Sequence, residues 1–217
     1  MKNKKGSFKL VAYEKIKQDI LNFVYRPKDR LIESQIASSL KISKTPVREA
    51  LLLLEREGLV TIVPNSGFFV CELSFKEAED CFELRRLIES YAIKRIIQNI
   101  TEEEIKLIKQ NLEETARYTN GQDIEKTIQL ETEFHNILYE ATKSKKIFSI
   151  LSTLQDQLHI YRSIASRTKG GTRVSFEEHM KIIEAIEKRD ELKAKFLVRR
   201  HIDHAKKRAL KKELFIE

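Results

Sequence analysis

The sequence contains no tryptophan, and it holds only two cysteines, three prolines and six glycines in 217 residues. So few glycines and prolines leave little room for the turns of an all-β fold, and a mostly helical protein is expected. Cys71 and Cys81 form neither a C-x-x-C pair nor a disulfide framework, so we interpret them as buried thiols. The longest uninterrupted apolar run extends only from Ala50 to Leu54, which excludes a transmembrane helix.

Charge is abundant and unevenly placed. The net charge of +8 and the isoelectric point near 9.3 favour a polyanionic partner, either nucleic acid or an acidic membrane surface. Residues 1–72 hold 13 basic and 8 acidic residues, whereas residues 73–217 hold 28 and 25. A basic protein without such a partner stays an alternative. The segment Met1 to Gly6 is not followed by the apolar stretch of a secretory signal, so we expect a cytosolic protein.

The length fits two modest domains, and we predict them at 1–73 and 74–217. In the first, Val11, Ile16 and Ile20 favour one face of a helix, and a second short helix follows at 33–40.

A third helix is predicted to begin with Thr45 as its N-terminal cap, with Ser43 as the competing cap, and to end at Gly58. Its apolar positions, including Val47 and Leu51, fall on one face. The β-branched run 59–63 and the run 68–71, separated by a turn, predict a two-stranded β hairpin.

Three helices followed by a hairpin form the winged helix–turn–helix arrangement, whose third helix fits the major groove of DNA. The same helical packing also occurs in proteins that do not bind DNA. Positive and hydroxyl groups gather at the start of the third helix, where side chains can reach bases or phosphates. The basic arm Lys2, Lys4 and Lys5 adds to this positive charge.

The stretch Ser43 to Leu51, followed by Leu54 to Val60, resembles the recognition-helix signature of GntR-type bacterial transcription regulators. The resemblance implies operator contacts from Lys44, Thr45 and Arg48, and a close approach of the wing tip to DNA at Gly67. Two positions depart from the family pattern. Arginine is usual where Lys44 stands and frequent where Ser66 stands, and lysine lacks the bidentate fork that binds guanine. Ser34, where some members carry a contacting arginine, is a weaker candidate.

From residue 74 onward, apolar residues three and four apart predict an antiparallel bundle of six helices. Capping boxes at Thr101–Glu104 and Ser175–Glu178, and a joint at Arg189–Asp190, support the division. We predict the helices at 74–98, 101–119, 121–141, 145–167, 173–188 and 190–213.

Four residues on three of these helices are candidate metal ligands. Glu131 and His135 share one helix face, and His179 and His201 come from two later helices. This spacing alone is a weak signal for a metal site, and by itself it favours scattered surface histidines.

The segments Glu131–His135, Glu178–Ile183 and Arg199–Ile202 resemble the effector domain of the FadR branch of GntR regulators, the FCD domain. In metal-binding members an aspartate and three histidines hold a divalent cation, and the matching residues are Glu131, His135, His179 and His201. Glutamate stands where the family has aspartate. Zinc is the first choice, with nickel or manganese open, and His159 and His204 are alternative ligands.

The resemblance also implies that a small organic acid binds at the metal, with Arg85, Tyr161 and Arg162 as candidate contacts. A surface ion pair of Arg85 with Glu89 is the alternative for that arginine. We therefore expect a dimeric, ligand-responsive DNA-binding repressor that binds a palindromic operator of double-stranded DNA. A DNA-binding regulator with a metal-free dimerisation bundle, or a metal-dependent hydrolase, are the competing functions. An activator is also possible, and nothing in the sequence names the effector.

Overall fold

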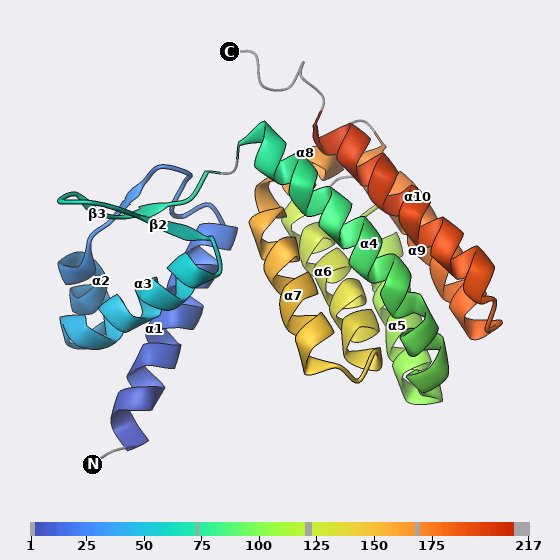
Figure 1. The fold of residues 1–217 in the computed structure, drawn as a ribbon, viewed down its shortest axis with the longest axis horizontal. Helices are drawn as coiled ribbons and strands as arrows, with labels where there is room; N and C mark the ends of the chain where they lie inside the picture. The colour runs from blue at the N-terminus through green and yellow to red at the C-terminus, as the bar shows by residue number, and fades with distance from the viewer. Residues whose placement is uncertain (1–2, 73, 120–122, 168–169, 211–217) are drawn as a thin grey trace. The chain divides into compact units, whose positions relative to one another are not determined.

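The computed structural model describes residues 3–72, 74–119, 123–167 and 170–210. The chain divides into two compact units, Met1–Ser74 and Phe75–Glu217 (Figure 1). Lys2 and the side chains of Lys4 and Lys5 lie outside what the structure describes. The first unit contains α1 (Asn3–Leu21), β1 (Arg30–Leu31), α2 (Glu33–Leu40), α3 (Lys44–Arg56), β2 (Val60–Val63) and β3 (Gly67–Val70).

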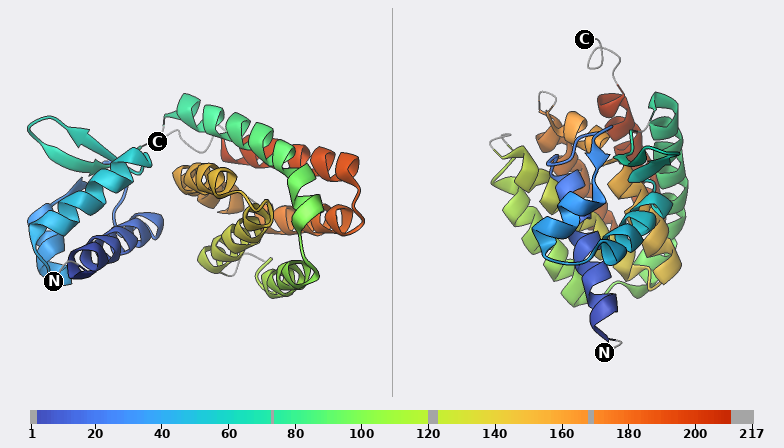
Figure 2. Two further views of the ribbon diagram at one scale, coloured as in Figure 1. Left: turned by 60° about the horizontal axis from the view of Figure 1, so that its bottom comes forward. Right: turned by 90° about the vertical axis from the view of Figure 1, so that its left-hand side faces the viewer.

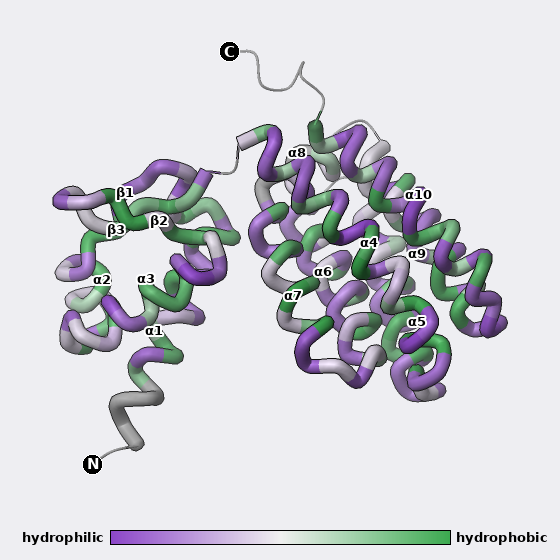
Figure 3. The backbone as a smooth tube through the Cα atoms, in the orientation of Figure 1, coloured by the Kyte–Doolittle hydropathy of each residue, from purple (hydrophilic) through white to green (hydrophobic). Residues whose placement is uncertain are grey.

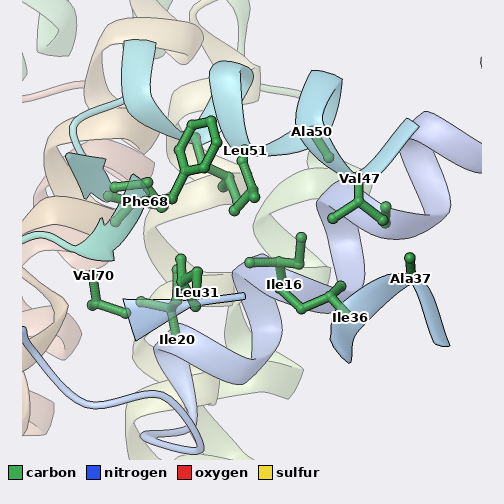
Figure 4. Close-up of a cluster of buried hydrophobic side chains, with 14 residues drawn as sticks. Ile16, Ile20, Leu31, Ile36, Ala37, Val47, Ala50, Leu51, Phe68 and Val70 are labelled. Carbon is green, nitrogen blue, oxygen red and sulfur yellow. The ribbon is translucent and has the colours of Figure 1, made fainter. Parts of the chain in front are cut away.

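The first unit is built around one apolar cluster, to which all three helices and the sheet contribute (Figure 4). In α1 the buried residues are Ala12, Ile16 and Ile20, spaced four apart. The prediction that Val11 belongs to this face is wrong, because its side chain is 49% exposed. From α3, Val47 joins the same cluster. The cluster fixes α3 by its apolar side, so the polar side of α3 faces away from the core.

Ser43, the competing cap, precedes α3 at the N-cap position with extended backbone angles, so Thr45 is already helical. Gly58 follows the helix in the left-handed conformation (φ 75°). The predicted hairpin forms with Val60 opposite Val70 and Val63 opposite Gly67.

The wing has three strands rather than the two predicted, in the order β1-β3-β2. β1 pairs antiparallel with β3, and Arg30 lies opposite Phe69. A strand of two residues is too short to show the alternation of apolar and polar residues by which strands are recognised in a sequence.

The second unit is a helical bundle (Figures 1 and 2). Its described helices are α4 (Phe75–Asn99), α5 (Glu102–Ala116), α6 (Ile124–Ala141), α7 (Lys145–Gln157), α8 (His159–Arg167), α9 (Gly171–Glu187) and α10 (Glu191–Ala209). The predicted helix 145–167 is divided in two at Leu158. The break carries neither glycine nor proline, and Leu158 still takes part in helical hydrogen bonds on both sides, so no residue pattern predicts it. The predicted ends at 121 and 213 lie outside the described residues.

Helix caps place most of the remaining boundaries. Thr101 and Glu104 form the predicted capping box at the start of α5. The second predicted box is wrong, because α9 begins at Gly171 after Gly170 in the left-handed conformation, and Ser175 lies inside the helix. Glu178 is therefore free for another partner.

Within the second unit, α10 packs along α4 and α9, while α6 packs between α5 and α7. Apolar and polar segments alternate along each helix, as expected for helices with one buried face (Figure 3). None of the helices in the described ranges has the length and apolar character needed to cross a membrane.

Candidate functional site

The first turns of α3 expose the side chains that the sequence predicts to contact DNA. Lys44, Thr45 and Arg48 are all exposed, because Val47 and Leu51 turn the other side of the helix into the core. Basic and hydroxyl groups at the start of a helix are suited to phosphate oxygens and base edges.

The wing adds to the same surface. Ser34, Lys44, Ser66 and Gly67 line one depression of about 140 Å³, so four of the six predicted residues lie together. Gly67 has φ +102°, a left-handed angle that residues with a side chain rarely adopt. Arg48 is not part of this depression. Its Nη1 lies 3.4 Å from Glu33 Oε1.

Arg30 is a residue of this surface that sequence reasoning missed. It is exposed on β1 and lines the depression with Lys44, and a Cβ built on Gly67 would lie 4.0 Å from its Nη2 atom. The sequence does not predict a role for Arg30 at this surface, because its position there depends on the pairing of β1 with the distant strand β3.

A cluster of three buried histidines occupies the interior of the second unit. His135 comes from α6, His179 from α9 and His201 from α10, and each offers a ring nitrogen within 4.8 Å of the other two. His179 Nε2 and His201 Nε2 are 3.3 Å apart. Within the described residues this is the group of His, Cys, Asp and Glu side chains that could hold a metal ion.

Glu178 orients one of these rings. Its Oε2 lies 2.9 Å from His201 Nδ1, and its Oε1 lies beside His204 Nδ1. A carboxylate at Nδ1 keeps the proton there, so Nε2 of His201 is left as the lone-pair nitrogen that faces His179. His204 thus contacts Glu178, which supports the cluster, but His204 itself is not a member of the histidine group.

Burial sets the charge of the cluster. It lowers the pKa of His135 well below the usual value, and the charge of Arg85 lowers it further. Burial also lowers the pKa of His179, with His201 adding to the effect. Both rings are therefore neutral at physiological pH, which is the form that binds metals.

Glu131, the fourth predicted ligand, lies at the same cavity but outside the histidine group. A cavity of about 20 Å³ is lined by Glu131, His135 and His201. Glu131 Oε1 is buried and has no hydrogen-bond partner among the described residues. A buried carboxylate oxygen without a partner is costly, and a cation would supply the missing contact. The donors therefore fit a divalent metal held by nitrogen and oxygen.

Arg85 forms the predicted ion pair with Glu89, but the pair is buried rather than on the surface. Arg85 Nε donates to Glu89 Oε1 at 2.8 Å, and Tyr139 Oη donates to the same oxygen at 2.7 Å. Glu89 Oε2 lies 3.9 Å from His135 Nδ1. Burial lowers the pKa of Arg85, but the charges and hydrogen bonds of Glu89 and Tyr139 together outweigh burial and raise that pKa.

The two other predicted effector contacts have different places. Arg162 lines the cavity, donates from Nη1 to Thr132 Oγ1 at 3.1 Å, and has Nη2 4.0 Å from Glu131 Oε2. Tyr161 is buried but is not one of the cavity residues. Burial lowers the pKa of Arg162.

Sequence reasoning missed Glu89, Tyr139 and Glu178 as parts of this centre. Glu178 directly precedes His179, and its position in a presumed capping box concealed its role. Glu89 was noted only as a surface partner of Arg85. The burial of a four-residue-spaced Arg–Glu pair is not visible in a sequence, because the same spacing is common on exposed helix faces.

Comparison with known proteins agrees with this architecture. Residues 9–70 match the family described as bacterial regulatory proteins, gntR family, and residues 80–204 match the FCD domain. The HTH-type transcriptional regulator YdhC of Bacillus subtilis is 29% identical over 203 residues, covering 93% of this chain and 91% of YdhC. The Uxu operon regulator of Haemophilus influenzae is 30% identical over 213 residues, covering 88% of this chain and 77% of that regulator.

A solved structure shows the same fold. Escherichia coli McbR/YncC superposes with a TM-score of 0.80 at 20% sequence identity, covering 90% of this chain and 93% of that one. The matched family and the relatives are transcriptional regulators rather than enzymes, which removes the basis for the hydrolase alternative. The chain therefore belongs to the GntR family of bacterial transcriptional regulators, in which a winged DNA-binding domain is joined to an FCD domain.

Proposed function

We propose that this regulator is a dimeric repressor that binds a palindromic operator and responds to a small organic acid at a divalent metal in its FCD domain. The observation that supports the sensing role is the buried centre. Three buried histidines form one group, and two of them line a cavity together with Glu131, which has an unpartnered carboxylate oxygen, and two buried arginines. Such a polar interior costs folding stability, so it is expected where it binds something. The cytosolic location stays a prediction.

On the DNA side, Lys44, Thr45 and Arg48 contact the operator. Ser34 and Ser66 contribute hydroxyl groups, and Gly67 allows the wing to approach the backbone closely. Lys44 acts as a point charge rather than as a bidentate donor, so it supplies affinity more than discrimination between bases. Arg30 lies on the same surface and provides a further phosphate contact.

In the FCD domain, His135, His179, His201 and Glu131 hold the metal. Zinc fits three imidazoles and a carboxylate, and nickel or manganese are the alternatives. When bound, the cation would supply a position for an oxygen of the acid. Glu178 maintains the orientation of the His201 ring.

Arg85 and Arg162, which line the cavity, would pair with the carboxylate of the effector, whereas Tyr161 is buried without lining the cavity. The cavity of about 20 Å³ is close to the space of one water molecule, roughly 10 to 15 Å³. An organic acid therefore has to enlarge it. α8 carries Arg162 and Ser166 of the cavity wall and is joined to α7 through the break at Leu158. The acid thus favours a displaced α8, and this differential binding is what couples the site to DNA.

The test is a coupling measurement on the full untagged chain. An operator is first selected from random duplex DNA, and its affinity is then measured with zinc-loaded and chelator-treated protein, with and without short mono- and dicarboxylates. We expect one carboxylate to change the affinity of the zinc-loaded protein by about 5- to 150-fold. An acid that binds tightly and leaves operator affinity unchanged would exclude the sensing role, and transcription in vitro distinguishes repression from activation.

A metal-free FCD domain is the second candidate, and the position of Glu131 outside the histidine group favours it. In that case the hydrogen bond between His179 and His201 is a structural contact, and the chelator has no effect on either metal content or operator affinity.

A further inference from the structure

Arg48 is contacted by groups from two other elements of the winged unit. Its Nη1 atom lies 3.4 Å from Oε1 of Glu33, the first residue of α2. Its guanidinium carbon lies 5.9 Å from the centre of the Phe68 ring on β3, within the range of a cation–π contact. The side chain of Arg48 is still 65% exposed, so these two contacts leave much of it open to DNA.

The fold fixes both of these supports independently of the arginine. Phe68 is 4% exposed, belongs to the apolar cluster of the first unit and lies opposite Leu31 in the sheet (Figure 4). Glu33 follows Leu31 by two residues, and its side chain is 28% exposed. A free arginine populates many rotamers, and contacts that restrict them before binding reduce the entropy that the side chain loses on DNA.

Glu33 is an unexpected residue at a surface for DNA. It lines the depression that also contains Arg30, Ser34 and Lys44, and among the described residues of that depression it is the only acid. A carboxylate at this place repels phosphate groups and therefore lowers affinity for every DNA sequence. Such a cost is offset if the carboxylate improves discrimination, because specificity is a difference between affinities.

A purely structural role for Glu33 predicts a different dependence on the length of its side chain. Ile32, the N-cap of α2, makes no side-chain capping hydrogen bond, and a negative charge in the first turn stabilises a helix. Aspartate supplies this charge as well as glutamate does. It is one methylene shorter, however, so from the same backbone position it would not reach Arg48. The variant Glu33→Asp therefore separates the stability of α2 from the orientation of Arg48.

We propose that Glu33 is a positioning residue that, together with the Phe68 ring, holds the guanidinium group of Arg48 in the orientation that reads a base pair of the operator. Glu33 thus sets sequence preference without contacting DNA itself. The inference rests on the proposed operator contact of Arg48 and adds the device that makes this contact selective. Glu33 lowers affinity for DNA in general and raises the ratio of operator affinity to affinity for other sequences.

The test measures the affinity of the full chain for its selected operator and for an unrelated duplex of equal length, at one salt concentration. We call the ratio of these two affinities the specificity ratio. Glu33→Gln and Glu33→Asp should each lower it by about three- to tenfold, a part of the roughly 5- to 150-fold that one bidentate arginine contact supplies. The matched control is Glu49→Gln, which removes an exposed acid from α3 and should leave the specificity ratio unchanged.

A double-mutant cycle links the effect to Arg48. In the Arg48→Ala background, Glu33→Gln should leave the specificity ratio unchanged, because the group that Glu33 positions is absent. A ratio that still falls in this background would mean that Glu33 accepts a hydrogen bond from a base, such as cytosine N4, and would overturn the positioning role. A Glu33→Asp variant with the wild-type ratio would also overturn it, because the role would then be the stability of α2.

Failure of this inference and failure of the proposed operator contact have different signatures. If Arg48→Ala lowers the specificity ratio but both Glu33 variants retain it, Arg48 reads the operator without a positioning residue. If Arg48→Ala itself leaves the ratio unchanged, the operator contact of Arg48 fails, and the role of Glu33 fails with it. Because both affinities come from the same preparation, a partial loss of folded protein cancels from the ratio.

Discussion

The two units of this chain place their polar residues in opposite ways. In the winged unit the fourteen clustered core residues are all apolar, and Arg30, Lys44 and Arg48 are exposed on the surface. In the helical unit the interior itself is polar, with Arg85 and His179 almost fully buried. A DNA-binding surface must remain accessible to a large polyanion, whereas a small-molecule sensor gains strength and selectivity from a dry interior. The location of polar residues therefore agrees with the kind of ligand that we propose for each unit.

The different placement of polar residues also affects the folding stability of the two units. An apolar core stabilises the winged unit without any ligand. In the helical unit, burial of charged and neutral polar groups without a full set of partners costs stability, and a bound metal would offset part of it. The following changes test whether the two units are independent in this way.

The largest expected effect is on metal content. His179→Ala removes one of three imidazoles, so we expect about one metal per chain in the untagged wild type to fall to nearly none. Metal content is measured by mass spectrometry of the elements. The matched control is His159→Ala on α8, outside the histidine group, which should retain the metal. Equal loss in both variants would contradict the assignment of the site.

The next effect is on the stability of the winged unit. Leu51→Ala opens a cavity at a fully buried position and should cost about 2 to 5 kcal/mol of unfolding free energy. Because the residue belongs to the first unit, DNA affinity should fall while metal content stays unchanged. Thermal unfolding followed by circular dichroism measures the loss, with Leu52→Ala, at a 37% exposed leucine of α3, as control. A parallel loss of metal would mean that the units are not independent.

A smaller effect is expected at the support of the histidine cluster. Glu178→Gln keeps the size of the side chain but weakens its hold on His201, and metal affinity should fall by about 10- to 100-fold. Competition with a chelator measures this. Glu177→Gln is the control, because Glu177 is exposed and pairs only with Arg173 among the described residues. If both variants bind metal equally well, Glu178 has no supporting role.

The smallest effect is expected at the residue missed in the wing. Arg30→Ala should weaken DNA binding similarly for all sequences and reduce the slope of log affinity against log salt by about 1, because one phosphate contact is lost. Arg48→Ala, by contrast, should also change sequence preference. Arg56→Ala, at the far end of α3, is the control. An unchanged slope for Arg30→Ala would remove it from the interface.

Much of the fold could be predicted because its signals are local. The capping box of Thr101, the hairpin and the apolar face of α3 each depend on residues close together in the chain. The third strand and the break at Leu158 could not, because the first depends on pairing with a distant strand and the second has no breaking residue. Ser175 resembled a cap, but the left-handed Gly170 starts the helix earlier.

The sequence by itself determined the winged helix–turn–helix, the helical bundle and the exposed residues at the start of α3. These follow from the period of apolar residues, which selects helix or strand and the side that is buried. Only the tertiary structure decided that three histidines from three helices meet, that Glu178 orients His201, and that Glu131 remains outside the group. Contacts between distant segments depend on how helices pack, and the spacing of residues along a chain does not contain that geometry.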